Sequence, residues 1–385
     1  SMRWADHELY WGRPLKSILC CFDNKTLEFE YHHLVSSNIT FIDKDFEQKT
    51  KKFVRFKDYL AFFRSQNIIL DNKKREQFIV DQLNRIAKKE NLKIHFNSTL
   101  LNEVTNIVEK PNIIKCRFNK RFLEIPDDIL VTTMQVHQKY FPTFDSRDNL
   151  TNNFFLVADN KDSKGLIKIG NENVVEARLN DAKFFWDKNK TQNLVKGISN
   201  LKKLSYFEGL GSYFEKIQRL RKLGALISDE LLISKEKVEI ASSICKVDLT
   251  SDLVNEFPEL QGVMGGHFAK SQGFDNDICL AIREHYLPIG PETKTPKKPY
   301  SVTLAMSDKL DTLSGFFAIN LKPTSSKDPF ALRRSAIGLI RLIVENKLEI
   351  KLKDIINYSF SLFSEQDVNF DIKLAQQDLY RFISD

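Results

Sequence analysis

Two carboxylates and a histidine in the second half of the chain are the residues closest to a catalytic or metal-binding set. Asp308 and Asp311 are three positions apart in a segment otherwise rich in apolar residues, so a helix would carry both carboxylates on one face. His285 lies at the end of the preceding helical pattern. Carboxylate and imidazole groups bind divalent cations, and they also form buried ion pairs. The spacing therefore predicts either a metal centre or a structural network.

The residues that precede this set favour the structural network. A divalent-metal phosphohydrolase of the HD type needs an adjacent His-Asp pair in addition to a histidine and a later aspartate. The segment that should carry this pair contains Cys245-Lys246, and a lysine repels a metal ion. We therefore expect no metal here and interpret His285, Asp308 and Asp311 as structural positions of a degenerate HD-like site. In this interpretation Asp308 accepts hydrogen bonds or pairs with a Lys or Arg.

Other catalytic patterns do not occur in the sequence. There is no G-x-x-x-x-G-K-[ST] loop and no strand-linked G-x-G-x-x-G, and we expect Gly209 and Gly211 to form a turn between helices. Neither a G-x-S-x-G elbow nor an H-E-x-x-H pair is present. Cys20 and Cys21 lie in a predicted strand, which favours packed thiols over nucleophiles. The sequence thus predicts no catalytic residue in this chain.

The first 60 residues contain the densest cluster of basic side chains. Five cations fall within nine residues, interleaved with Phe53 and Phe56, a pattern typical of an RNA surface with stacking rings. These candidate RNA-binding residues are Lys49, Lys51, Lys52, Arg55 and Lys57. Basic clusters also form ordinary solvated surfaces, so this cluster is a candidate only.

Two further basic stretches lie in the second half. Lys297 and Lys298 belong to the Pro/Lys-rich loop 288–299, and we add both to the RNA-binding candidates. Asp328-Pro329 predicts the start of a helix, with Pro at its first position, followed by Arg333 and Arg334. Adjacent helix residues point about 100° apart, so one partner cannot face both arginines. We assign Arg333 to the RNA-binding candidates and expect Arg334 to brace Asp308 or Asp311 inside the fold.

Composition and charge agree with a globular intracellular protein. Hydrophobic residues make up 42% and charged residues 28%, which excludes a disordered chain and a coiled coil. The formal net charge is +7, which permits a polyanionic partner. The 5 cysteines form no Cys-x-x-Cys pair, so a disulfide framework and a structural zinc site are not expected. With no apolar h-region at the N-terminus and no membrane-spanning stretch, we predict a cytoplasmic location and no membrane partner.

The periodicity of apolar residues predicts a multidomain α+β protein. Residues 1–190 alternate strands and helices, including a hairpin around residues 23–25 and a helix that begins after Asp71, which is typical of an α/β module. From about Asn171 onward the strands disappear, and one apolar stripe follows Val175, Leu179, Ala182 and Trp186. We assign residues 191–345 to an all-helical domain and 346–385 to the start of a further, truncated helical region. Further helical patterns cover residues 212–227, 235–246, 275–286, 301–319, 329–344 and 371–382.

Longer blocks of sequence resemble the β subunit of bacterial heterotetrameric glycyl-tRNA synthetase. The two strongest are SDKLDTL at residues 307–313 and SKDPFALRR at 326–334. Their order and spacing match along nearly the whole chain, which is far more specific than any single motif. The other blocks are SMRW (1–4), LNEVTNIVE (101–109), TTMQVHQKYFP (132–142), ARLNDAKFF (177–185), EFPELQG (256–262) and EHYLP (284–288).

This resemblance implies a division of labour between two kinds of subunit. In the family, the α subunit makes glycyl-adenylate with ATP and Mg, and the β subunit binds tRNA(Gly) and completes an α₂β₂ enzyme. This chain would bind no cofactor itself. Its first 190 residues resemble the editing-type domain of phenylalanyl-tRNA synthetase β chains, and residues 191–345 resemble a degenerate HD domain. The chain looks like a fragment, with an anticodon-binding domain expected after Asp385 and further sequence before Ser1. Two alternatives stay open, a metal-dependent HD-type phosphohydrolase and a tRNA-editing hydrolase module.

Overall fold

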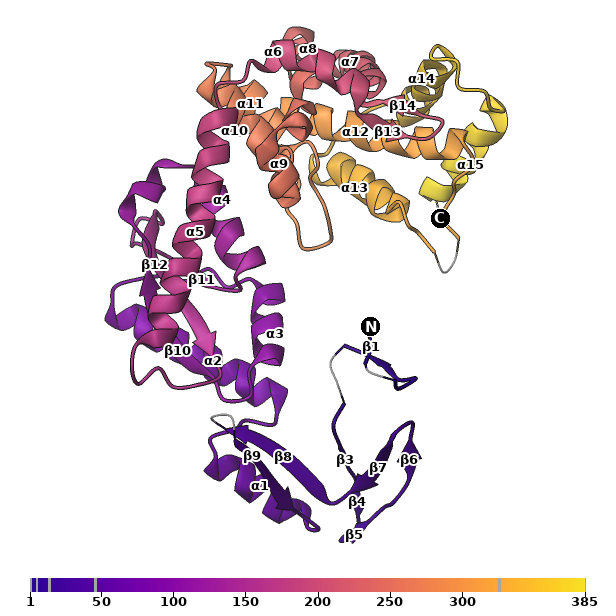
Figure 1. Ribbon diagram of the computed structural model, residues 1–385. Helices are drawn as coiled ribbons and strands as arrows, with labels where there is room; N and C mark the ends of the chain where they lie inside the picture. Colours follow the sequence, from indigo (N-terminus) through magenta and orange to yellow (C-terminus); the bar gives the residue numbers. More distant parts are fainter. Residues whose placement is uncertain (1, 5, 13–14, 45–46, 325–326, 385) are drawn as a thin grey trace. The chain divides into compact units, whose positions relative to one another are not determined.

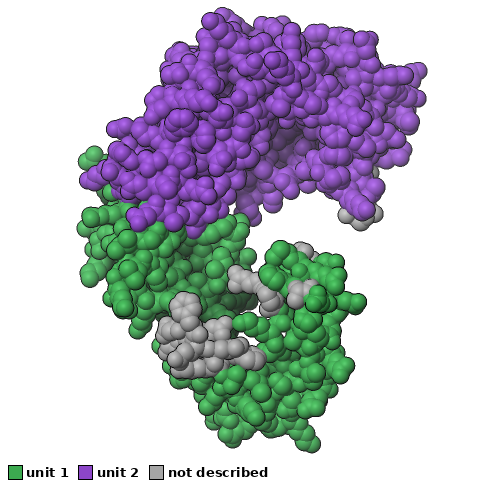
Figure 2. Space-filling view, in the orientation of Figure 1, with its two compact units in different colours: residues 1–117, 139–172 green, residues 118–138, 173–385 purple. Residues whose placement is uncertain are grey.

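The computed structural model describes residues 2–4, 6–12, 15–44, 47–324 and 327–384, without the side chains of 41–44 and 47–49 (Figure 1). The chain forms two compact units, shown in separate colours in Figure 2. Unit 1 consists of residues 1–117 and 139–172, and unit 2 of residues 118–138 and 173–385. Helix α5 (Leu166–Asn189) begins in unit 1 and ends in unit 2. Helices and small sheets together confirm a mixed α+β protein.

The described part of unit 1 contains short strand pairs, two three-stranded sheets, three whole helices and the first residues of α5. Between β4 (Cys21–Phe22) and β5 (Lys25–Thr26), Asp23 and Asn24 have positive φ angles of 46° and 61°, as a two-residue hairpin turn requires. This is the hairpin that the sequence predicted. The other elements are β1 (Met2–Arg3), β2 (Tyr10–Trp11), β3 (Ile18–Leu19), β6 (Glu30–Tyr31), β7 (Leu34–Ser37), β8 (Ile39–Lys44), β9 (Glu47–Lys52), α1 (Phe56–Ser65), α2 (Asn72–Lys89), α3 (Ser98–Ile107), β10 (Asn112–Arg117), β11 (Phe141–Phe144) and β12 (Leu150–Ala158).

A buried core of unit 1 lies between two helices and the sheet β10-β12-β11. Ile79 of α2 and Val104 of α3 pack with Phe141 and Phe155 of the sheet, and all four are buried. Asp71 caps α2, because its carboxylate accepts the N–H of Lys74. The apolar spacing of these helices therefore turns one face of each toward the sheet.

Unit 2 is almost entirely helical. Two short strands, β13 (Ser205–Phe207) and β14 (Gly211–Ser212), interrupt the helices, so the expectation that no strand follows residue 171 is wrong at this point. Gly209 and Gly211 adopt φ angles of 82° and 79° in this hairpin, which a side chain would strain. Its helices are α4 (Asp127–Thr132), α6 (Leu194–Gly197), α7 (Tyr213–Glu230), α8 (Lys235–Ile244), α9 (Asp252–Glu256), α10 (Val263–Ser271), α11 (Asn276–Glu284), α12 (Pro299–Ala318), α13 (Leu332–Glu345), α14 (Leu352–Ser364) and α15 (Ile372–Ser384).

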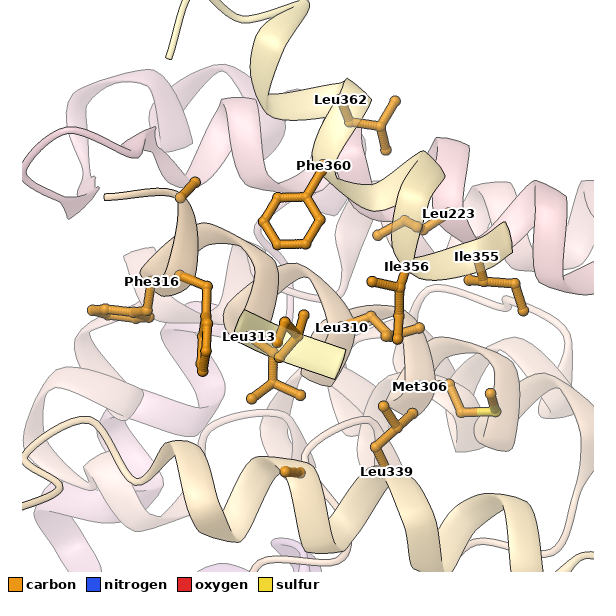
Figure 3. Close-up of a cluster of buried hydrophobic side chains, with 14 of the residues drawn as sticks. Leu223, Met306, Leu310, Leu313, Phe316, Leu339, Ile355, Ile356, Phe360 and Leu362 are labelled. Carbon is orange, nitrogen blue, oxygen red and sulfur yellow. The ribbon is translucent and has the colours of Figure 1, made fainter. Parts of the chain in front are cut away.

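Helix α12 forms the centre of unit 2. It packs against α7, α11, α13, α14 and α15, and nearly every residue along it is buried. Figure 3 shows Leu310 and Leu313 of α12 among side chains from neighbouring helices, including Leu339 of α13 and Phe360 of α14. A helix that is apolar on most sides is stable only when other helices surround it. Seven polar side chains of α12 are therefore buried with it: Ser301, Thr303, Ser307, Asp308, Lys309, Asp311 and Ser314.

Two details of the helices bear on the sequence predictions. The stripe Val175, Leu179, Ala182 and Trp186 is the buried face of α5, as its spacing predicted. The sequence predicted Pro329 as the first residue of a helix, but helix α13 begins three residues later, at Leu332. Asp328 still caps this helix, because its carboxylate accepts the N–H groups of Leu332 and Arg333 at 2.9 and 3.0 Å. The units also divide the chain at positions other than residues 190 and 345, and the assignment of residues 1–190 to an editing-type module stays a prediction.

Candidate functional site

Asp311 belongs to a buried cluster of charged side chains in unit 2. Its carboxylate is fully buried and accepts hydrogen bonds from Lys216 Nζ at 2.8 Å and from Arg219 Nε and Nη2 at 2.5 and 3.2 Å. Both cations come from α7, where positions three apart lie on the same face. Burial alone would raise the pKa of Asp311, but the charges of Arg219 and Lys216 outweigh it and lower the pKa below its ordinary value. Asp311 is therefore an ionised member of a buried ion-pair network.

Asp308 occupies the next turn of α12 toward the N-terminus and also pairs with lysines. Its Oδ1 is 2.8 Å from Lys246 Nζ and 3.4 Å from Lys216 Nζ. Burial acts to raise the pKa of Asp308, and the charges of the two lysines more than offset it, so the pKa lies well below the ordinary range. Lys246 also lies over the ring of Tyr286, 3.8 Å from its centroid. These contacts describe an ion-pair network around Asp308.

His285 is a neutral member of the same cluster. Its Nδ1 donates to the carbonyl oxygen of Ile282 at 2.6 Å, because a carbonyl can only accept. Nε2 therefore has a free lone pair and accepts from Lys246 Nζ at 2.8 Å. Burial, reinforced by the charge of Lys246, lowers the pKa of His285 to about 3. The imidazole carries no charge at neutral pH.

The donor set around Asp308 does not fit a divalent metal ion. Lys246 Nζ is 2.8 Å from both His285 Nε2 and Asp308 Oδ1, so an ammonium group lies where the two ligands would have to share a cation. A metal ligand set also needs unprotonated donors turned toward one point, and lysine offers only N–H groups. In the part of the chain that the structure describes, no three His, Cys, Asp or Glu residues come together as a possible metal site.

The structure brings in cations that the sequence analysis did not assign to this cluster. Lys216 and Arg219 lie 90 or more residues before Asp311, and only the packing of α7 on α12 joins them. Arg334, expected to brace Asp308 or Asp311, is exposed and has no ion-pair or hydrogen-bond partner among the described residues. That expectation is wrong, because Lys216, Arg219 and Lys246 already pair with the two aspartates and the side chain of Arg334 stays exposed. The capping box Ser212-x-x-Glu215 does mark the helix that supplies the cations.

Asp248 is a second buried carboxylate in unit 2. Its Oδ2 accepts the N–H groups of Gly262 and Gly265 at 2.5 and 3.1 Å, whereas its Oδ1 has no hydrogen-bond partner among the described residues. Burial raises the pKa of Asp248 to about 6. Sequence reasoning did not single it out, since a lone aspartate in an apolar segment carries no motif.

The basic residues of unit 1 lie on its surface. Lys51, Lys52, Arg55 and Lys57 are exposed, and the side chain of Lys49 lies outside the described residues. Lys51 and Lys52 follow each other in β9, so their side chains leave opposite faces of the hairpin. Lys51 Nζ is 5.7 Å from the ring centroid of Phe62.

The two phenylalanines of this cluster have different environments. Phe56 is 72% exposed and available for stacking. Phe53 is only 6% exposed and packs against the rings of Tyr59, Phe62 and Phe63. The interpretation of Phe53 as a stacking ring is therefore wrong, because it is part of the local core.

The basic candidates of unit 2 lie at separate places on that unit. Lys297 is exposed and donates to the carbonyl oxygen of Glu345 at 3.1 Å. Lys298 is exposed and immediately precedes α12. Arg333 is half-buried, and its Nη2 donates to the carbonyl oxygen of Thr324 at 2.7 Å. None of the helices in the described part of the chain is both long enough and apolar enough to cross a membrane.

Comparison with known proteins agrees with the resemblance seen in the sequence. Residues 1–385 match the family described as glycyl-tRNA synthetase beta subunit. The glycine–tRNA ligase beta subunit of Rickettsia canadensis is 36% identical over 378 residues, which are 97% of this chain and 56% of the relative. That of Rickettsia conorii is 37% identical over 381 residues, 98% of this chain and 57% of the relative. The chain spans about half the length of the curated relatives it matches. Because the match covers all 385 residues, the chain belongs to the family of glycyl-tRNA synthetase beta subunits.

Proposed function

We propose that this chain is the part of a cytoplasmic glycine–tRNA ligase that binds tRNA(Gly) and supports the attachment of glycine by a partner α subunit. In this proposal the α subunit uses ATP and Mg to activate glycine, and the two kinds of subunit form an α₂β₂ enzyme. The names of the relatives support the reaction and the subunit type. The single observation in the chain that carries the tRNA-binding role is the exposed basic surface of unit 1.

This basic surface extends around the end of β9 and the start of α1: Lys51 and Lys52 leave opposite faces of the hairpin, and Arg55 and Lys57 follow with the exposed ring of Phe56 between them. Cations at such positions neutralise phosphates and release bound counterions, which gives RNA affinity without sequence preference. An exposed ring can stack on an unpaired base. Arg55 also forms an ion pair with Asp58 at 2.7 Å, but the two side chains are 69% and 48% exposed, so a phosphate can compete for the guanidinium group.

The test is tRNA binding by the 385-residue chain across a salt series. The variant Lys51→Ala/Lys52→Ala removes two charges of the basic surface, and Lys88→Ala/Lys89→Ala removes two exposed charges from the end of α2 in the same unit. We expect only the first variant to weaken binding at low salt and to flatten the slope of log K against log salt by about 1–2 units. Equal slopes for both variants and the parent chain would contradict the proposal.

The division of labour has its own test in pyrophosphate exchange with glycine and ATP. We expect no exchange by this chain alone, since its sequence contains no phosphate-binding glycine loop, and exchange when the α subunit is added. Exchange by the chain alone would refute the assignment of the ATP chemistry to the partner. The contacts of Lys246 with Asp308 and His285 argue against the alternative of a metal-dependent phosphohydrolase.

A further inference from the structure

A solvent-accessible pocket of about 450 Å³ lies beside the buried ion-pair network of unit 2. The side chains of Asp308 and Lys309 on α12 and of Arg334 on α13 line it together with Tyr286 and Ile289. Small-molecule pockets commonly have this size and combine apolar walls with a few polar groups. None of the residues of the basic surface in unit 1 contributes to this pocket.

The network beside the pocket contains more buried cations than carboxylates. The four buried cations are Lys216, Arg219, Lys246 and Lys309, and the three buried carboxylates are Asp248, Asp308 and Asp311. A buried charge without a counter-charge is costly, so this excess favours an anionic group at the accessible side of the network. That side is the pocket, because both Asp308 and Lys309 reach it.

Lys309 is a buried cation at the pocket with a donor left for a ligand. It is 7% exposed, and its Nζ donates to the carbonyl oxygens of Tyr286 and Pro288, both at 3.1 Å. An ammonium group has three N–H donors, so one remains after these two bonds. Burial lowers the pKa of Lys309 to about 8, and a bound anion would stabilise its charged form. Lys309 thus suits a phosphate oxygen.

Arg334 provides a second cation on the same pocket. It lies in the first turn of α13, and among the described residues it has no ion-pair or hydrogen-bond partner. Its five N–H donors and the positive end of the helix dipole both favour a phosphate. The preceding residue, Arg333, does not line the pocket and donates to the carbonyl oxygen of Thr324.

The carboxylates of the pocket select against a simple polyanion. Lys246 and Lys216 both approach Oδ1 of Asp308, and Oδ2 has no partner among the described residues. Glu259 adds an exposed carboxylate to the lining. Carboxylate oxygens accept hydrogen bonds, so a ligand that fills the pocket must present hydroxyl or amino donors as well as its phosphate. The apolar surface of Tyr286 and Ile289 then suits a flat ring.

We propose that this pocket binds a ribonucleotide, with the phosphate at Arg334 and Lys309, the ribose hydroxyls at Asp308 and the base against Tyr286 and Ile289. A phosphate, a cis-diol and a flat base occur together in a free mononucleotide and in the 3′-terminal nucleotide of an RNA. The two sources share this chemistry. The proposal does not depend on the basic surface of unit 1, and its failure would leave the tRNA-binding role untouched.

The first experiment is calorimetric titration of the 385-residue chain with the four ribonucleoside 5′-monophosphates. We expect at least one to bind, and Arg334→Ala to weaken that binding by about tenfold, the usual effect of losing a hydrogen bond to a charged group. Arg333→Ala is the matched control, and its affinity should stay within about twofold of the parent chain. Failure of all four to bind at about 5 mM, or equal losses for both arginine variants, would overturn the proposal.

The hydroxyl contact is tested on the ligand, because Asp308→Asn also removes the counter-charge of two buried lysines. The 2′,3′-dideoxy form of the bound nucleotide should bind about tenfold more weakly than the ribonucleotide. Equal affinity of the two forms, or of inorganic phosphate and the nucleotide, would refute the proposed role of Asp308. A single-stranded RNA with a free 3′-diol and the same RNA with a 3′-phosphate distinguish the sources. If only the RNA with the free 3′-diol displaces the bound nucleotide, the natural ligand is an RNA end. If neither RNA displaces it, the ligand is a free nucleotide. Both results support the proposed pocket.

Discussion

Replacement of Asp311 by asparagine is the sharpest test of the buried network. The substitution keeps the size of the side chain and removes its negative charge. One carboxylate oxygen accepts from Arg219 Nε, and the other accepts from Lys216 Nζ and Arg219 Nη2. In asparagine one of these two positions becomes an NH₂ group, so a donor faces donors in either orientation of the amide. Two buried cations lose a counter-charge at the same time.

The expected loss of stability is about 3 kcal/mol. Breaking a buried ion pair by removing one partner typically costs about 3–5 kcal/mol, because the remaining charge is left uncompensated. Here the lower end applies, since Lys216 keeps Asp308 at 3.4 Å and Arg219 keeps Gln366 Oε1 at 2.5 Å. For a domain of roughly 150–250 residues, 1 kcal/mol lowers Tm by about 2–4 °C, so Asp311→Asn should lower the Tm of unit 2 by about 6–12 °C.

The assay is urea unfolding followed by far-UV circular dichroism, with Glu365→Gln as the matched control. Glu365 pairs with Lys222, which also belongs to α7, but both side chains are about half exposed. Exposed pairs contribute about 0–1 kcal/mol, so the control should unfold nearly like the parent chain. If Asp311→Asn destabilises the chain no more than Glu365→Gln does, the network does not hold α7 on α12 and the reasoning is wrong.

Three further predictions concern pH and close packing. The pKa of Asp248 is about 6 in the folded chain and about 4 when unfolded, so its contribution to stability is full below pH 4 and is lost as the pH rises through 6. The stability of Asp248→Asn relative to the parent chain should therefore rise by up to about 2–3 kcal/mol between pH 4 and 7. A stability difference in urea unfolding that stays constant with pH would contradict this. His285 should remain neutral, with the proton on Nδ1, from pH 8 down to 5, which ¹⁵N NMR of the imidazole reports directly; titration near 6.5 would disprove its contact with Lys246. A Cβ at Gly266 would lie 2.8 Å from the carbonyl oxygen of Cys279, so Gly266→Ala should lower the free energy of unfolding by about 1–3 kcal/mol. The control Gly170→Ala, in an open part of α5, should leave stability unchanged or raise it. Similar thermal melts of the two variants would refute the close packing at Gly266.

Local patterns in the sequence predicted most of the helices and their buried faces. The stripe from Val175 to Trp186 lies on one side of α5, because a helix repeats its apolar positions at a spacing set by its own geometry. Asp71 was similarly informative, since a cap acts on N–H groups a few residues away. The start of α13 was predicted three residues too early, because Asp328 caps it across an intervening turn that the dipeptide Asp-Pro does not reveal.

The partners of the buried charges could not be predicted in the same way. The sequence indicated that Asp308 needs a cation, and Arg334 was the nearest arginine in a recognisable block. The cations come instead from α7 and from Lys246, just after α8, and both helices pack on α12 from positions far away in the chain. Helical periodicity defines which residues share a face, but it does not define which helix covers that face.

Lys246 explains why a carboxylate and an imidazole lie close together in this cluster without forming a metal site or acting as a general base. A metal ion between them would carry two positive charges and an exchangeable position at which water loses a proton. The ammonium group of Lys246 contributes one charge and only donors, so it neutralises Asp308 and fills the lone pair of His285 at 2.8 Å each. The charge of Asp308 is thereby compensated and the lone pair of His285 is occupied, so neither group is available as a general base. The acceptor and donor positions that remain for a ligand are the other oxygen of Asp308 and the ammonium group of Lys309, both at the pocket. They can bind a ligand there but do not activate it for a reaction.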